Sequence, residues 1–310
     1  MDYALRTDNL SRSFKTVRAL DRLTFEVPRG IVFGFLGPNG AGKTTTIRLL
    51  LGLLKPTEGR AEVLGFDTSS DAAGIRERCG ALLEHTGLYE RLSAEANLTF
   101  YGRVNRMPRA ECSARIRELL ERFDLWERRG ERVAGWSRGM KQKLAVARSM
   151  LHRPSLLFLD EPTAGLDPVA AAGLRDILSR LASDEGLTVF LTTHNLAEAE
   201  KLCSRVGIIN RGRLVTVGGT DDLRSGGKTV RATITGGNIT ESAVAKVNAC
   251  EGVVNARLID SGLAVDIEPE TSLAPVVKLL VAENAAIEEV RKDRASLEDI
   301  FLKLMEEERS

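Results

Sequence analysis

The sequence is poor in cysteine, and its few cysteines do not cluster. Four occur among 310 residues, at positions 79, 112, 203 and 250, and only three histidines accompany them. These positions lack the close spacing of a metal site or a disulfide framework. The pattern predicts free thiols in a reducing compartment, with the cytoplasm as the default.

Long apolar runs and a dominant charge sign are also missing. The longest apolar stretches, such as Leu49–Leu54, fall far short of the ~20 residues that a membrane-spanning helix needs. The first ten residues show no basic region followed by an apolar block, so we expect no secretory signal. A formal net charge of +1 argues against a protein that coats nucleic acid. With 43% hydrophobic residues, the chain is expected to be soluble and to bury a core.

The first two thirds of the chain alternate short apolar runs with helical patterns, which predicts an α/β domain over residues 1–220. Between about Asn97 and Arg153 the pattern becomes charged and helical, which predicts a helical subdomain inserted in that domain. The predicted strands span residues 23–27, 31–36, 156–159 and 188–193.

A stretch rich in Gly, Asp and Ser, from Gly218 to Lys228, predicts a domain boundary. From residue 228 to 310 the signals run βαββαβ, which is the ferredoxin-like order of a small α+β domain. A last helix is predicted after Ser296, which together with Asp299 has the spacing of a capping box. This domain shows no chemistry of its own, so we expect it to serve dimer contact, regulation or ligand sensing.

The stretch LGPNGAGKTTT, residues 36–46, has the form of a phosphate-binding loop between a strand and a helix. Its glycines let backbone N–H groups converge on phosphates, Lys43 reaches the outer phosphates, and the Thr44 hydroxyl is a ligand for Mg²⁺. A Gly-rich loop before a helix, without function, is the alternative. The predicted nucleotide contacts are Gly37, Pro38, Asn39, Gly40, Ala41, Gly42, Lys43, Thr44 and Thr45.

Two carboxylates follow the predicted strand at residues 156–159. Ligands bind at the carboxyl ends of strands in open α/β sheets, so Asp160 is a candidate Mg²⁺ ligand and Glu161 a candidate general base. The alternative is a strand that leaves the core into a charged turn. Together with the phosphate-binding loop, the two carboxylates favour nucleotide hydrolysis.

A third motif distinguishes among the many protein families that share the phosphate-binding loop and the two carboxylates after a strand. The segment WSRGMKQKL, residues 136–144, resembles the signature motif of the ATP-binding cassette (ABC) superfamily. AGLD, residues 164–167, resembles the D-loop of that family, and His194 matches its switch histidine. With the helical insertion, the resemblance covers about residues 1–220.

The resemblance implies a set of partners and roles. Two identical chains are expected to sandwich two ATP molecules head to tail, so that each chain carries half of each catalytic site. Glu161, His194 and Lys43 are the implied catalytic residues, and Thr44 and Asp160 the implied Mg²⁺ ligands. The further implied nucleotide contacts are Ser137, Gly139, Met140, Asp167 and Phe14. For Phe14, which would stack on adenine, a core phenylalanine is the open alternative.

Some positions depart from the usual pattern of the family. Glu84 stands where glutamine is common and would be a third Mg²⁺ ligand, although its charge leaves that duty open. Arg138 replaces the first glycine of the signature pair. The glutamate before GLYERLS, the SxGMKQ form of the signature and the ending SLEDIFLKL together resemble ATP-binding subunits of the daunorubicin-resistance type of multidrug exporter.

The function implied by this branch is ATP hydrolysis that powers efflux of a drug, antibiotic or lipid-like substrate through separate polytopic membrane subunits. The chain would then lie at the cytoplasmic side of the cell membrane as a peripheral subunit. The alternative is a soluble ABC ATPase acting on ribosomes or DNA. Such proteins usually carry two cassettes or a long coiled coil, and this chain has neither.

Overall fold

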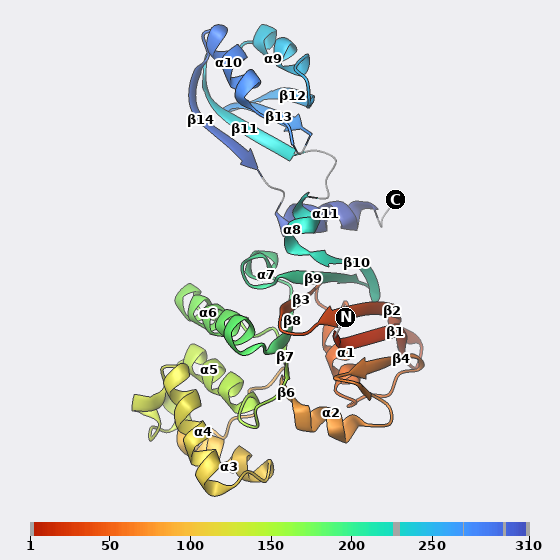
Figure 1. Cartoon of the computed structure of the whole chain (residues 1–310), viewed down its shortest axis with the longest axis vertical. Helices are drawn as coiled ribbons and strands as arrows, with labels where there is room; N and C mark the ends of the chain where they lie inside the picture. The colour runs from red at the N-terminus through yellow and green to blue at the C-terminus, as the bar shows by residue number, and fades with distance from the viewer. Residues whose placement is uncertain (1–2, 226–229, 269, 294–295, 308–310) are drawn as a thin grey trace. The chain divides into compact units, whose positions relative to one another are not determined.

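The computed structural model describes residues 3–225, 230–268, 270–293 and 296–307. The chain divides into two compact units, Met1–Gly218 and Gly219–Ser310, shown from red to green and from green to blue in Figure 1. The first unit is α/β, as the alternating sequence pattern predicts. Among the described residues, none of the helices combines the length and the apolar content that a bilayer span requires.

A six-stranded sheet carries the functional residues of the first unit. Its order is β10-β9-β3-β8-β7-β6, and the four neighbour pairs from β9 to β6 are parallel. The central strands β3, β7 and β8 are buried along their whole length, which explains their continuous apolar sequences. The strands are β3 (Val32–Leu36), β6 (Cys79–Leu82), β7 (Leu156–Asp160), β8 (Thr188–Thr193), β9 (Arg205–Asn210) and β10 (Arg213–Gly219).

A second, antiparallel sheet has the order β2-β1-β4-β5. Its strands are β1 (Tyr3–Phe14), β2 (Val17–Pro28), β4 (Glu58–Val63) and β5 (Phe66–Asp67). Strand β2 contains the predicted strand at residues 23–27 and is longer than predicted, whereas β1 was missed. Strand β1 has several register shifts against β2. These shifts interrupt the period-two alternation of polar and apolar residues by which a strand is predicted from sequence.

Helices of the first unit cover the large sheet and form the predicted insertion. Residues 97–153 contain no β-strand apart from one bridge that pairs Arg132 with Ser93 just before them, and their regular elements are helices. The insertion begins slightly earlier than predicted, because the Ser93 side chain caps α3 by accepting from Ala96 N–H. Its helices are α3 (Ala94–Val104), α4 (Arg109–Arg122) and α5 (Arg138–Ser149); the others are α1 (Lys43–Leu50), α2 (Ala72–Arg78), α6 (Pro168–Glu185) and α7 (Leu196–Leu202).

The second unit follows the element order βαββαβ. Its antiparallel sheet has the order β12-β13-β11-β14, and Figure 1 shows α9 and α10 on one face. Residues from both layers, including Ile234, Val265 and Leu280, form a separate hydrophobic cluster. The elements are β11 (Val230–Gly237), α9 (Glu241–Asn248), β12 (Val253–Ile259), β13 (Gly262–Ile267), α10 (Ala274–Ala282) and β14 (Ala286–Asp293).

Two further helices, α8 (Thr220–Ser225) and α11 (Leu297–Glu307), pack against each other. The predicted capping box at the start of α11 is present, since Asp299 accepts from Ser296 N–H at 2.9 Å while the Ser296 hydroxyl accepts from Asp299 N–H at 3.1 Å. The first two residues of the strand predicted from Lys228 lie outside the described residues.

Candidate active site

The loop between β3 and α1 has a backbone that only glycine fits at two positions. A Cβ added to Gly37 would lie 2.3 Å from the Ile209 carbonyl oxygen. Gly42, which begins α1, has φ +107°, a conformation that side chains disfavour, and a Cβ there would meet Leu20 Cδ2 at 2.5 Å. The first N–H groups of α1 therefore face the loop without side chains in between, as phosphate binding requires.

Lys43 lies folded back over this loop and is buried, with 6% of its surface exposed. Its ammonium donates to the carbonyl oxygens of Gly37 at 2.7 Å and Pro38 at 3.2 Å. Glu161 Oε1 lies 3.3 Å from the same nitrogen. The candidate cation and the candidate base, which are 118 positions apart in sequence, thus meet at the end of the sheet.

Thr44 and Asp160 form the second contact between the loop and β7. The Thr44 hydroxyl donates to Asp160 Oδ2 at 2.6 Å. The other carboxylate oxygen, Oδ1, accepts a hydrogen bond from the Thr192 hydroxyl, which lies opposite Asp160 in the β7–β8 register. Sequence reasoning missed Thr192; its signal was a threonine near the end of the neighbouring parallel strand, two positions before His194.

Glu161 is held in an uncommon backbone conformation, with φ 51°. Its N–H donates to the Thr192 carbonyl oxygen at 3.1 Å and lies 3.2 Å from the Thr192 hydroxyl oxygen. His194 Nδ1 lies 2.9 and 3.0 Å from the two Glu161 carboxylate oxygens. In this arrangement His194 orients the carboxylate of the candidate base.

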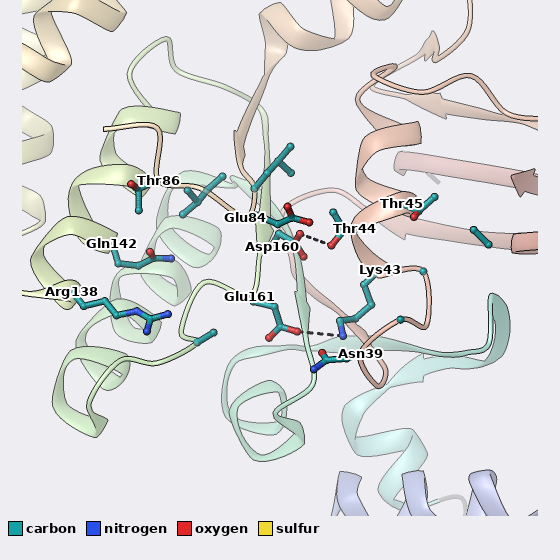
Figure 2. Close-up of a pocket in the computed structure, with 16 residues that line it drawn as sticks. Asn39, Lys43, Thr44, Thr45, Glu84, Thr86, Arg138, Gln142, Asp160 and Glu161 are labelled. Atoms are coloured by element: carbon teal, nitrogen blue, oxygen red, sulfur yellow. Dashed lines mark hydrogen bonds and ion pairs between the residues drawn. The ribbon is translucent and has the colours of Figure 1, made fainter. Parts of the chain in front are cut away.

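Several of the candidate residues line one cavity of about 390 Å³ at the carboxyl ends of the strands (Figure 2), and Gly37, Pro38, Ala41 and His194 are not in its lining. Glu84, the predicted third Mg²⁺ ligand, is among the lining residues, and its carboxylate is ion-paired with Arg48 at 3.4 Å and more than half exposed. Sequence reasoning assigned neither Arg138 nor Gln142 to the cavity, and it also missed Ala19, Leu82, Leu83, Thr86 and Ala164. The lining also includes Asn39, Gly40, Gly42, Lys43, Thr44, Thr45, Asp160 and Glu161.

The residues implied by the signature and D-loop lie at helix starts outside this cavity lining. Ser137 caps α5 by accepting from Met140 N–H at 3.3 Å. Asp167 caps α6 by accepting from the N–H groups of Val169 at 3.1 Å and Ala170 at 2.9 Å. Both side chains therefore have a local structural duty in the single chain.

Phe14, at the end of β1, is 40% exposed, which makes the core alternative wrong. The Arg12 guanidinium lies 4.6 Å from the centre of its ring. One ring face therefore already has a cation against it. Phe14 is not among the residues that line the cavity described above.

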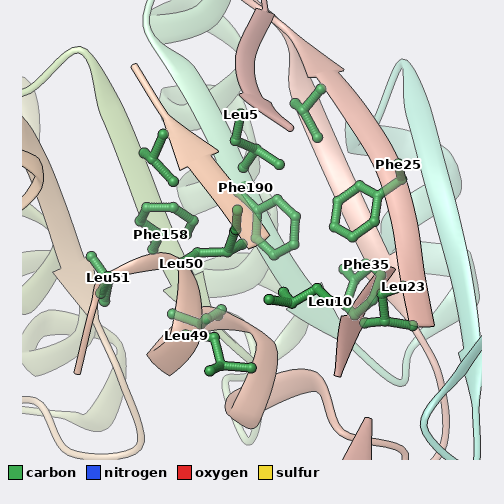
Figure 3. Packing of buried hydrophobic residues seen from close by; sticks show 14 of the residues in the cluster. Leu5, Leu10, Leu23, Phe25, Phe35, Leu49, Leu50, Leu51, Phe158 and Phe190 are labelled. Carbon is green, nitrogen blue, oxygen red and sulfur yellow. The ribbon is translucent and has the colours of Figure 1, made fainter. Parts of the chain in front are cut away.

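A hydrophobic cluster fixes the elements that carry the site. Figure 3 shows Leu49 and Leu50 of α1 packed near Phe158 of β7 and Phe190 of β8, and all four side chains are fully buried. The two phenylalanine rings have centroids 5.6 Å apart. Because these side chains are close-packed, α1 cannot shift relative to β7 without opening a void beneath Thr44 and Asp160.

The oxygen donors suit Mg²⁺. Among the described residues, no group of three or more His, Cys, Asp or Glu side chains could hold a metal. Mg²⁺ at nucleotide sites needs fewer, because one or two protein oxygens share it with phosphates and water. The adjacent Thr44 hydroxyl and Asp160 carboxylate supply such hard oxygens.

Comparison with known proteins agrees with this geometry. The sequence profile of the ABC transporter family matches residues 20–164. The daunorubicin resistance ATP-binding protein DrrA3 of Streptomyces coeruleorubidus is 37% identical over 312 residues, which cover 99% of this chain and 98% of that protein. The bacitracin transport ATP-binding protein BcrA of Bacillus licheniformis is 40% identical over 215 residues, or 69% of each chain.

Solved structures share the fold. An ATP-binding subunit of an ABC transporter, 33% identical in sequence, superposes with a TM-score of 0.64 over 71% of this chain and 92% of its own. The match to DrrA3 extends through both units of this chain. The chain therefore belongs to the ABC transporter family, as an ATP-binding subunit and ATPase related to drug- and antibiotic-resistance exporters.

Proposed function

We propose that this chain hydrolyses Mg²⁺-bound ATP to power efflux of a drug, antibiotic or lipid-like substrate through separate membrane subunits. The observation that carries the hydrolysis is that Lys43 and His194 both contact the Glu161 carboxylate. The full-length likeness to a daunorubicin resistance protein supports the direction and the kind of cargo. The chain would act at the cytoplasmic side of the cell membrane, as a peripheral subunit.

Each residue has a task in the reaction. Glu161 orients the attacking water and accepts its proton, and His194 holds the Glu161 carboxylate in place. Lys43 exchanges part of its contact with loop carbonyls and Glu161 for the γ-phosphate, where it stabilises developing negative charge. Mg²⁺ bound by Thr44 and Asp160, with Glu84 as a third ligand, would neutralise the phosphate oxygens.

The second half of each site is proposed to come from a second copy of this chain. Ser137, Gly139 and Met140 at the start of α5, and Asp167, are absent from the cavity lining of their own chain, within the described residues. Ser137 is exposed, and so is Val169 just after Asp167, which leaves these surfaces free for a partner. ATP favours the closed dimer only if it binds that form more tightly than the open one.

The base role is tested by Glu161→Gln. We expect steady-state turnover to fall on the order of 10³-fold, because the amide cannot accept the proton of water. ATP binding, measured by equilibrium dialysis, is expected to persist. Glu127→Gln, at an exposed position of the helical insertion, is the control and is expected to keep full turnover. Undiminished turnover in Glu161→Gln would remove Glu161 from the base role.

The same variant tests assembly and transport. With saturating ATP and Mg²⁺, Glu161→Gln is expected to run as a dimer in light scattering, and a strict monomer would contradict the shared site. A polytopic membrane protein is expected to co-purify from detergent-solubilised membranes. Stable sedimentation with ribosomes instead would favour a soluble ATPase without transport. The second unit is proposed to contribute dimer contact or regulation.

A further inference from the structure

Arg138 is a positively charged residue at a helix N-terminus, where it does not stabilise the helix. It is the first residue of α5, after the Ser137 cap, and the first turn of this helix contains no acidic residue. The helix dipole places partial positive charge there, so a basic side chain is disfavoured. Among the described residues, Arg138 has no hydrogen bond or ion pair that would offset this cost. A residue that breaks a local rule in this way is expected to have another task.

The Arg138 guanidinium lies flat against Gly165 of the D-loop. A Cβ built on Gly165 would lie 2.2 Å from Nη1, 2.4 Å from Cζ and 2.7 Å from Nη2 of Arg138. Three close distances to one planar group show that the face of the guanidinium covers the glycine. Gly165 has φ +69°, so glycine is favoured there by conformation as well as by space.

One turn further along α5, Gln142 makes a second contact with the same loop. Its Nε2 donates to the Pro162 carbonyl oxygen at 2.8 Å. Residues i and i+4 share one helix face, so the side chains of Arg138 and Gln142 reach the loop together. Figure 2 shows both on one side of the cavity, with Glu161 drawn between them and Lys43.

The loop between these contacts begins directly after Glu161. Ala164 N–H donates to the Glu161 carbonyl oxygen at 3.1 Å, and Leu166 N–H donates to the Thr163 carbonyl oxygen at 3.2 Å. The left-handed backbone conformation of Glu161 is strained and persists only where its surroundings impose it. The contact at Gly165 lies four residues further along the same loop.

We propose that Arg138 is a positioning residue, whose guanidinium covers Gly165 and thereby keeps the loop 162–166 and the Glu161 carboxylate in their working geometry. With Gln142, it links the start of α5 to the D-loop within one chain. The effect on turnover rests on the proposed role of Glu161, whereas the effect on the loop does not. Arg138 itself is not required to touch the nucleotide.

The proposal is tested in the full chain with Arg138→Ala. We expect kcat for ATP hydrolysis to fall about tenfold while KM for ATP stays within about twofold, because geometry at the base is lost and nucleotide contacts are kept. Hydrogen exchange of the amides of residues 162–166 is expected to become faster. Lys141→Ala is the matched control, since Lys141 lies on the same helix but pairs with Glu90 at 2.7 Å.

A double-mutant cycle isolates the contact with Gly165. Gly165→Ala alone is expected to lower kcat, because the new methyl group displaces the guanidinium and strains the backbone. In the Arg138→Ala background the same substitution is expected to cost less, because only the strain remains. Compared with Arg138→Ala, Arg138→Lys is expected to recover only part of the kcat, because an ammonium group lacks the planar face of the guanidinium.

Three results would overturn the proposal. One is a rise in KM with unchanged loop exchange, which would assign Arg138 to nucleotide binding across the dimer. Another is unchanged kcat together with unchanged exchange. The third is full additivity of the Arg138 and Gly165 substitutions. If Glu161→Gln retained turnover, the proposed base would fail, and the exchange measurement would still decide whether Arg138 restrains the loop.

Discussion

The two units of this chain differ in what they bury. In the first unit Lys43, Arg115 and Asp160 are buried, with 6%, 3% and 7% of their surfaces exposed. In the described part of the second unit no charged side chain is buried, and Thr220 is the one buried polar residue. Its core consists of aliphatic and small apolar side chains such as Val265 and Leu280.

Burial of a charge is costly unless the group is paired and hydrogen-bonded. The first unit meets that condition with Glu161 and loop carbonyls around Lys43, with Glu118 and the Met150 carbonyl oxygen around Arg115, and with two threonine hydroxyls around Asp160. The second unit has no such arrangement among its described residues. The contrast places the buried, paired charges of the candidate active site in the first unit.

The largest expected effect is the loss of stability when a substitution opens a cavity in the second unit. Leu280→Ala removes a fully buried side chain of α10 and is expected to cost about 2–5 kcal/mol of unfolding free energy. ATPase kcat is expected to stay unchanged, because no residue of the active site lies in that unit. Calorimetry and a turnover assay on the same samples measure both. Val281→Ala, at a neighbouring exposed position, is the control, and a parallel loss of kcat would show that the units are coupled.

A small change in the first unit is expected to lower ATPase turnover more than stability, which is the opposite of the Leu280→Ala result. Thr192→Val keeps the shape but removes the hydroxyl that donates to Asp160. A hydrogen bond to a charged group contributes about 1.5–3 kcal/mol, so we expect turnover to fall about 10- to 100-fold.

Thr193→Val is the matched control for that prediction. Its hydroxyl accepts from Asn195 N–H at 2.9 Å and makes no hydrogen bond with either carboxylate among the described residues. We expect this variant to lose some stability but little turnover. Equal losses of turnover in the two variants would contradict a specific role for Thr192.

The smallest effect concerns a histidine of the first unit outside the active site. Burial lowers the pKa of His152 below its ordinary value of 6.5, and the ring lies 3.1 Å from the Cys79 carbonyl oxygen. The unfolded chain therefore takes up a proton more readily, and stability is complete above pH 6.5 and declines as pH falls below it. His152→Gln is expected to reduce this acid-dependent decline in urea unfolding.

A control for the histidine prediction is His85→Gln, because His85 is exposed. This variant is expected to follow the unsubstituted chain at pH 8 and pH 5.5. An unchanged acid decline in His152→Gln would mean that other groups carry the pH dependence.

Local signals predicted much of the fold. The apolar runs that became β3, β7 and β8 are buried on both faces of a parallel sheet, so they stand out in sequence without any knowledge of neighbours. Strand β1 was missed because its register shifts break the regular alternation. The loop at Gly37–Thr44 was readable because its backbone geometry demands particular residue types.

The contacts within the site could not be predicted from the local sequence in the same way. Thr192 becomes a partner of Asp160 only through the pairing of β7 with β8, and Arg138 covers Gly165 only because α5 packs near the D-loop. The sequence placed His194 among the implied catalytic residues, and only the fold brings its ring to the Glu161 carboxylate. Such pairs depend on which strand ends and helix starts meet.

The sequence alone determined the chemical groups available: a lysine and a threonine on a glycine loop, two carboxylates after a buried strand, and a histidine after another. The tertiary structure decided which of them touch, because hydrogen bonds and ion pairs act over a few ångströms, whereas these residues are separated by as many as 151 positions from Lys43 to His194. Only the packing of α1 against β7 and β8 brings them within that range.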